Sequence, residues 1–260
     1  MGVNVALNAS LRVDNVVDAW GGGSLPSNAR DPITIVATTV KVPPGAVQKI
    51  LPQLAFGGGW YTALYFTNTS AAAVSFPVNF ISNTGAPLTL PSVGNSSTVV
   101  SLAPRGTAII EAPNAGTLNQ GFVSMTLPGE VAGYGVFRQS SPGVGDQEAV
   151  VPLSSGTSTS STLVWDDTNF VTAAAIVNPS AVATTVTITI RDTNGLIIGT
   201  SSLAMDANNK VAVALRDLPG LSGMPGKRGS ADFKVSAGNV AVLGLRFGGS
   251  AFTSIPTTDH

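Results

Sequence analysis

Two stretches of the chain decide the fold that the sequence predicts. Residues 60–88 read WYTALYFTNTSAAAVSFPVNFISNTGAPL, and residues 170–198 read FVTAAAIVNPSAVATTVTITIRDTNGLII. Aligned without a gap, they share residues such as Asn68 with Asn178, and they agree in the spacing of their apolar positions. Self-similarity at one long spacing is typical of repeated structural units. The sequence therefore predicts two tandem copies of one unit.

Alternation of apolar and polar residues predicts that each copy is built from strands. In residues 184–192, Val186, Ile188 and Ile190 fall on one side and threonines on the other. This period of two is the pattern of a half-buried strand. The matching stretch 74–82 contains Pro77, which predicts an edge or bulged strand because proline donates no ladder hydrogen bond.

Similar patterns predict strands along most of both copies. About seven short strands per unit with turns between them is the pattern of a sandwich domain. We therefore expect an all-β protein of two tandem immunoglobulin-like or fibronectin-like β-sandwich modules. The further strands are expected at 59–68, 97–102, 107–112, 120–127 and 131–138, and at 170–177, 196–203, 210–215, 230–236 and 239–247.

The organisation that follows has four parts. Residues 1–49 do not repeat and are expected to be an extended segment or added strands. Module 1 is expected at 50–154 and module 2 at 163–260. Residues 155–162 are rich in Ser, Thr and Gly, a composition that predicts a flexible linker.

Composition excludes several classes of protein. Hydrophobic residues make up 43% of the 260 residues and charged residues 10%, which argues against disorder. The net charge of −1 and the scattered Lys and Arg residues predict no nucleic-acid partner. No apolar run is long enough to predict a membrane span. Met1 to Asn4 lack the pattern of a signal peptide, so export is predicted from the Ser-, Thr-, Asn- and Gly-rich composition alone.

Several phrases resemble repeats of large secreted proteins from soil bacteria, notably Acidobacteria. They include Gly135-Val136-Phe137-Arg138 and Val177-Asn178-Pro179-Ser180, together with the stretches 146–152 and 244–256. The resemblance covers residues 50–258. It implies export and a β-sandwich fold, but it carries over no functional residue.

Candidate metal ligands gather near the start of the second copy. Asp166 and Asp167 precede its first repeated strand, and Asp192 and Asn194 lie in the following turn. Carboxylate and amide oxygens on loops at one end of a sandwich are suited to calcium. The alternative is that these residues cap turns by accepting backbone hydrogen bonds. No other cofactor is predicted.

Catalytic chemistry has little support in the sequence. The one histidine is His260, and the chain has no cysteine. The carboxylates Glu111, Asp146 and Glu148 are the remaining candidates, since a pair of carboxylates at a suitable distance hydrolyses glycosidic bonds. The alternative is that these carboxylates are ordinary solvated side chains on the surface.

Five aromatic residues are candidates for ligand binding. Exposed aromatic rings stack on sugars or fill protein interfaces. Alternation places Tyr61 and Tyr65 on one face of a strand and Trp60 on the other, and one of these faces is core. Trp20 and Trp165 are expected in loops. The alternative for each tryptophan is packing in a core.

The leading functional prediction is a non-catalytic extracellular module for binding, adhesion or spacing, with polysaccharide or a cell-surface protein as partner. Duplication favours it, because two weak sites raise avidity. One alternative is a self-assembling structural subunit that uses edge strands. Another is an atypical metal-assisted hydrolase of ester or glycosidic bonds. The oligomeric state does not follow from the sequence.

Overall fold

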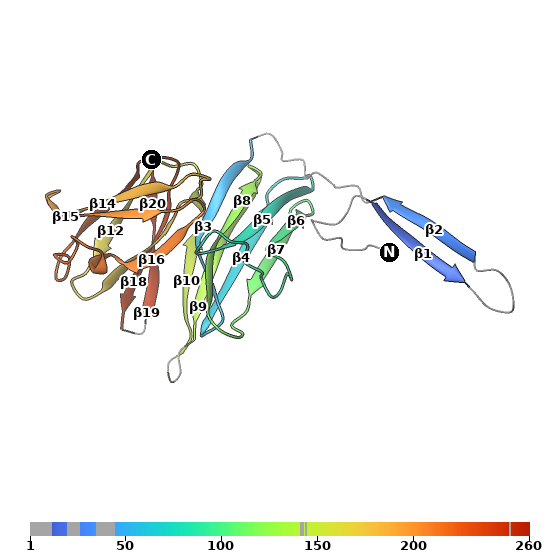
Figure 1. The fold of residues 1–260 in the computed structure, drawn as a ribbon. Helices are drawn as coiled ribbons and strands as arrows, with labels where there is room; N and C mark the ends of the chain where they lie inside the picture. The colour runs from blue at the N-terminus through green and yellow to red at the C-terminus, as the bar shows by residue number, and fades with distance from the viewer. Residues whose placement is uncertain (1–11, 20–26, 35–44, 141–142, 144, 250) are drawn as a thin grey trace. The chain divides into compact units, whose positions relative to one another are not determined.

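A computed structural model describes residues 12–19, 27–34, 45–140, 143, 145–249 and 251–260 (Figure 1). Strands make up 62% of the structure, and the described residues contain no α-helix, so the all-β class is confirmed. The one helical element there is a 3₁₀ turn, η1 (Leu215–Asp217). Accordingly, none of these ranges contains a helix with the length and apolarity that crossing a membrane requires.

Strands follow one another along the whole described chain. In order they are β1 (Arg12–Ala19), β2 (Ser27–Thr34), β3 (Val47–Phe56), β4 (Trp60–Asn68), β5 (Val74–Ser82), β6 (Ser97–Leu102), β7 (Thr107–Ala112), β8 (Asn119–Leu127), β9 (Val131–Gln139), β10 (Gln147–Pro152), β11 (Ser154–Ser155), β12 (Ser160–Asp166), β13 (Val171–Val177), β14 (Thr184–Asp192), β15 (Ile197–Met205), β16 (Lys210–Ala214), β17 (Arg228–Val235), β18 (Ala241–Gly248), β19 (Ala251–Ile255) and β20 (Thr257–Asp259).

The chain divides into two compact units, residues 1–41 and residues 42–260. In the first unit, β1 and β2 pair antiparallel over their whole length, from Arg12 opposite Thr34 to Ala19 opposite Ser27. The second unit contains all the other strands and both large apolar cores.

Four small antiparallel sheets make up the second unit. Their strand orders are β10-β9-β4-β7, β11-β3-β8-β5-β6, β16-β13-β18-β19 and β15-β14-β17-β12-β20. They are arranged as a propeller-like array of four blades, and the strands of each blade come from separated parts of the sequence. In β14 the side chains alternate between buried and more exposed, as the threonine-rich pattern predicts.

The predicted pair of tandem immunoglobulin-like or fibronectin-like β-sandwiches is therefore wrong. In an immunoglobulin domain the first two strands are neighbours in one sheet. Here β3 pairs with β8 instead of β4, and β4 pairs with β7 and β9. The connections 57–59 and 128–130 carry the chain from one sheet to another, so the order of the sheets differs although the strands lie near the predicted places.

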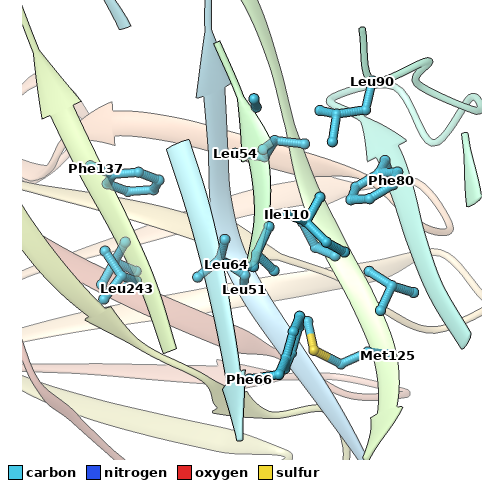
Figure 2. Packing of buried hydrophobic residues seen from close by; sticks show 14 of the residues in the cluster. Leu51, Leu54, Leu64, Phe66, Phe80, Leu90, Ile110, Met125, Phe137 and Leu243 are labelled. Carbon is cyan, nitrogen blue, oxygen red and sulfur yellow. The ribbon is translucent and has the colours of Figure 1, made fainter. Parts of the chain in front are cut away.

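The prediction of two self-contained repeated modules is wrong as well, because one core draws on both halves of the second unit. Leu243, Leu245 and Phe252 belong to the same buried cluster as Leu51 and Leu64. Figure 2 shows Leu243 beside the residues of the earlier strands. Apolar side chains of β18 and β19 are thus covered by β3, β4 and β10, which a separate module would leave exposed.

Two further sequence expectations concern short segments. Residues 155–162, expected as a flexible linker, contribute to β11 and β12, and Ser161 Oγ donates to Asp259 Oδ1 at 3.0 Å. The edge position predicted for the strand with Pro77 is wrong, because β5 lies between β8 and β6. Its ladder with β8 begins at Val78, so the missing N–H of Pro77 interrupts no bond there.

Candidate functional site

A groove of about 410 Å³ lies where β4 meets β13, β16 and β18. We call it the Trp60 groove. Its volume falls in the range of about 300–1,000 Å³ that is usual for small-molecule sites. Apolar side chains dominate its lining and no charged residue lines it. The lining includes Gln53, Trp60, Gln120, Ala173, Ala175 and Phe247.

Trp60 is held in place by a tight turn. Gly57 N–H donates to Trp60 O at 3.0 Å, and Trp60 N–H donates to Gly57 O at 3.1 Å. The backbone of Gly57 has a φ of +73°, and an added Cβ would lie 2.2 Å from Thr117 O. Only glycine fits such a position without strain. The glycine run therefore fixes where the indole enters the groove.

Aromatic rings form one wall of the Trp60 groove. The ring centroids of Trp60 and Phe252 are 5.7 Å apart, and those of Phe247 and Phe252 are 5.9 Å apart. Trp60 and Phe247 remain only partly buried, whereas Phe252 is buried behind them. The wall thus offers two partly exposed rings on a rigid apolar support.

Small side chains form the floor. Ala173 of β13 lies opposite Ala214 of β16, and Ala175 lies opposite Ala212. In the ungapped alignment of residues 60–88 with residues 170–198, the residues that align with Ala173 to Ala175 include Leu64 and Tyr65, which are much larger. Because alanine ends at Cβ, the sheet leaves space above it that larger residues would fill.

Two amides border the apolar surface. Gln53 is 8% exposed, and its Oε1 has no hydrogen-bond partner in the described part of the protein. Gln120 Oε1 accepts a hydrogen bond from Asn83 Nδ2 at 3.4 Å. A buried polar atom without a hydrogen-bond partner lowers the stability of the folded protein by about 1–3 kcal/mol. Such atoms are rare in native proteins, and a ligand that binds the atom is one reason to retain it.

Asn83 also contacts a buried lysine. Lys210 Nζ donates to Asn83 Oδ1 at 3.3 Å, and the backbone N–H of Lys210 donates to Asn83 O at 3.0 Å. Burial removes water from the ammonium group and lowers the pKa of Lys210 to about 7. A polar chain therefore runs from Lys210 through Asn83 to Gln120 at the groove.

The structure separates the predicted aromatic residues. Tyr61 and Tyr65 lie with Tyr134 on the other face of β4, away from the buried core cluster that contacts Trp60. Tyr65 stacks on Tyr134 with centroids 5.1 Å apart. Tyr61 Oη donates to Glu111 Oε1 at 2.6 Å. Burial, followed by this hydrogen bond, raises the pKa of Tyr61 to about 12.

The other two predicted tryptophans do not join the groove. Trp165 lies within β12, not in a loop, and is fully buried. Its Nε1 donates to Ser230 O at 3.0 Å, so it serves as a core residue whose one polar atom is satisfied. Trp20 lies outside the described residues.

Of the four candidate metal ligands, the three aspartates accept local hydrogen bonds. Asp166 Oδ1 accepts from Thr168 N at 2.9 Å, and Asp192 Oδ1 accepts from Asn194 N at 2.8 Å. The Thr168 hydrogen bonds lower the pKa of Asp166. Asn194 itself is exposed. These contacts are turn caps.

Asp167 is buried away from the others. Its Oδ1 accepts from Thr172 N at 2.8 Å, and its Oδ2 lies 3.6 Å from Arg216 Nε, an ion pair too long for a hydrogen bond. No group of three or more His, Cys, Asp or Glu side chains suited to a metal occurs among the described residues. The structure therefore does not bring the predicted ligands together into one coordination site.

The carboxylates considered for catalysis also have partners. Glu111 accepts the Tyr61 hydroxyl, and Glu148 Oε2 accepts from Arg138 Nη2 at 3.0 Å. The guanidinium of Arg138 lies 4.9 Å from the centroid of the Tyr61 ring. Asp146 is exposed. This network lies on the outer face of the sheet that contains β4, the face that carries Tyr61 and Tyr65. It resembles a surface ion-pair cluster more than a pair of free catalytic acids.

Sequence reasoning missed Gln53, Phe247 and the alanine floor. One signal was present: Gln53 interrupts an otherwise apolar run in Ile50–Phe56, all of which is buried. Alternation reports which residues face a core, but it does not report which two sheets meet. Comparison with protein-family models, with curated proteins and with solved structures finds no match for this chain.

Proposed function

We propose that the protein is a non-catalytic binding module, extracellular or at the cell surface, that takes a neutral carbohydrate in the Trp60 groove. The observation that carries the proposal is the pairing of an aromatic wall with the buried, unpartnered amide of Gln53. Sugar rings present C–H faces that pack on aromatic rings and hydroxyl groups that bond to amides. The uncharged lining favours a neutral ligand over a charged one.

The groove itself supports binding more than catalysis. Its lining residues include no carboxylate, histidine, lysine or hydroxyl side chain. General acid–base or nucleophilic catalysis needs such a group within hydrogen-bond reach of the substrate. Trp60, Gln53 and Gln120 instead offer packing and hydrogen bonds, which hold a ligand without changing it.

Depletion of the protein from solution by insoluble neutral polysaccharides tests this proposal. We expect retention on at least one of cellulose, chitin, xylan and mixed-linkage glucan. Trp60→Ala should weaken retention by about 2 kcal/mol, or about thirtyfold, as truncation of a central aromatic residue does. Tyr134→Ala removes an exposed ring from the outer face and is the matched control. Equal retention of the Trp60 variant and the unchanged protein would exclude the groove.

Self-assembly is a second candidate function, favoured by the two-stranded sheet of β1 and β2. In the described residues 12–19 and 27–34, each strand pairs along one edge only. Isolated two-stranded sheets are marginally stable, and free edges template pairing with other chains. Sedimentation over a range of concentrations should show a rising mass, and Val16→Pro should abolish that rise. A constant monomer mass would rule this function out.

A further inference from the structure

A second cavity, of about 780 Å³, lies among β12, β17, β18 and β19 and the turn after β14. Unlike the Trp60 groove, it is lined by charged side chains, namely Asp166, Asp192, Arg228 and Arg246. Equal numbers of acidic and basic groups fit a ligand that carries both an anionic group and hydrogen-bond donors.

Arg246 is held in place but has no anionic partner. Its guanidinium lies 4.7 Å from the centroid of the Phe170 ring, a cation–π contact that orients the group. Within the described residues it makes no ion pair and no side-chain hydrogen bond. Its donors are therefore available to a ligand.

The first half of the second unit has the same arrangement with the partner present. Arg138 lies over the Tyr61 ring at 4.9 Å, and its cross-strand neighbour Glu148 pairs with it at 3.0 Å. The cross-strand neighbour of Arg246 is Thr253, which cannot supply a charge. The protein thus has an arginine–aromatic pair twice, and only the second lacks its carboxylate.

Arg228 adds a second guanidinium to the cavity. It lies opposite Asp166 in the pairing of β12 with β17, yet no ion pair joins them in the described part of the chain. Two arginines that line one cavity are suited to a carboxylate because each presents parallel N–H donors.

Each of the two aspartates has one carboxylate oxygen, Oδ2, that is available to accept a hydrogen bond from a ligand. Oδ1 of Asp166 is occupied by Thr168, and Oδ1 of Asp192 by the N–H groups of Asn194 and Leu196. Neither Oδ2 accepts a hydrogen bond from another described residue. The hydrogen bonds from Thr168, and after them the charges of Arg228 and Arg246, lower the pKa of Asp166, which keeps that carboxylate ionised. Ionised oxygens are strong acceptors for sugar hydroxyl groups.

We infer that this cavity is a second binding site, for an acidic sugar of the uronic acid class. Arg246 and Arg228 bind the carboxylate of the ligand, and Asp166 and Asp192 accept bonds from its hydroxyl groups. The site is independent of the Trp60 groove, because no residue lines both cavities.

Calorimetric titration of the full chain with galacturonate, galactose and sulfate tests the inference. Galacturonate should bind more tightly than either control ligand. Arg246→Gln should weaken it about tenfold to a hundredfold, the loss expected for charge-assisted hydrogen bonds. Arg138→Gln removes the equivalent arginine of the first half and should leave binding unchanged.

Thr253→Glu provides the decisive variant. It places a carboxylate across the strand from Arg246, as Glu148 lies across the strand from Arg138. This carboxylate should pair with Arg246 and suppress galacturonate binding, although Arg246 itself is unchanged. Trp60→Ala should leave galacturonate affinity unchanged, which separates this site from the proposed function. Equal affinity for galactose or for sulfate overturns the acidic-sugar site, as does a Thr253→Glu variant that binds like the unchanged protein.

Discussion

Replacing Lys210 by methionine should make the protein more stable at neutral pH. The lysine is 2% exposed, and its amine contacts Asn83 as its hydrogen-bond acceptor. Burial is the cause of its pKa of about 7, against an ordinary value of 10.5. Between these two pH values the unfolded chain binds a proton that the folded chain does not. The free energy of unfolding therefore rises with pH across this window.

The magnitude follows from the two pKa values. Each pH unit in the window contributes about 1.4 kcal/mol. The difference between 10.5 and about 7 thus corresponds to about 5 kcal/mol, present in full above pH 10.5 and lost by pH 7. Methionine removes this cost but leaves Asn83 Oδ1 without its donor, at about 1–3 kcal/mol. The variant should be more stable by about 2–4 kcal/mol at pH 7, and this advantage should vanish between about pH 8 and pH 10.

Urea unfolding followed by tryptophan fluorescence at pH 7, 8, 9 and 10 measures this difference. The unchanged protein should gain stability across the series, and the Lys210→Met variant should not. Lys234→Met, at an exposed lysine of β17, is the control and should run parallel to the unchanged protein. Parallel curves for Lys210→Met would refute the reasoning, because they would mean that the buried amine titrates as it does in water.

Three further predictions concern the groove and the outer face. Gln53→Leu should raise the free energy of unfolding by about 1–3 kcal/mol, since it removes the unpartnered amide, and should weaken polysaccharide retention. Urea unfolding and depletion assays measure the two effects, and a loss of stability would contradict the first. Gly57→Ala should lower stability by more than about 1 kcal/mol in urea unfolding, because its Cβ would meet Thr117 O at a positive φ. Ultraviolet titration should find the Tyr61 hydroxyl ionising near pH 12, so the stability from this group is present in full below pH 10 and is lost as the pH rises from 10 to 12, where the unfolded tyrosine ionises first. Glu111→Gln should bring this ionisation toward pH 10, and an unchanged titration would contradict the role of the hydrogen bond.

The candidate sites show where sequence reasoning reaches its limit. Alternation separated Trp60 from Tyr61 and Tyr65, and the structure indeed places them on opposite faces of β4. Trp165 looked like a loop residue because two aspartates follow it, yet it lies within β12 as a buried core residue. The two arginines of the second cavity come from β17 and β18, and no spacing in the sequence signals that they line one cavity.

Local pattern by itself determined that the protein is all-β and where most of its strands lie. Residues 184–192 are an example, because a side chain's face in a strand depends only on its neighbours along the chain. Strand pairing, the propeller-like order of the four sheets, and the core that joins Leu243 to Leu51 were decided only by the tertiary structure. The physical reason is that an apolar face favours burial without specifying its partner, so the pairing depends on how all the faces are covered together.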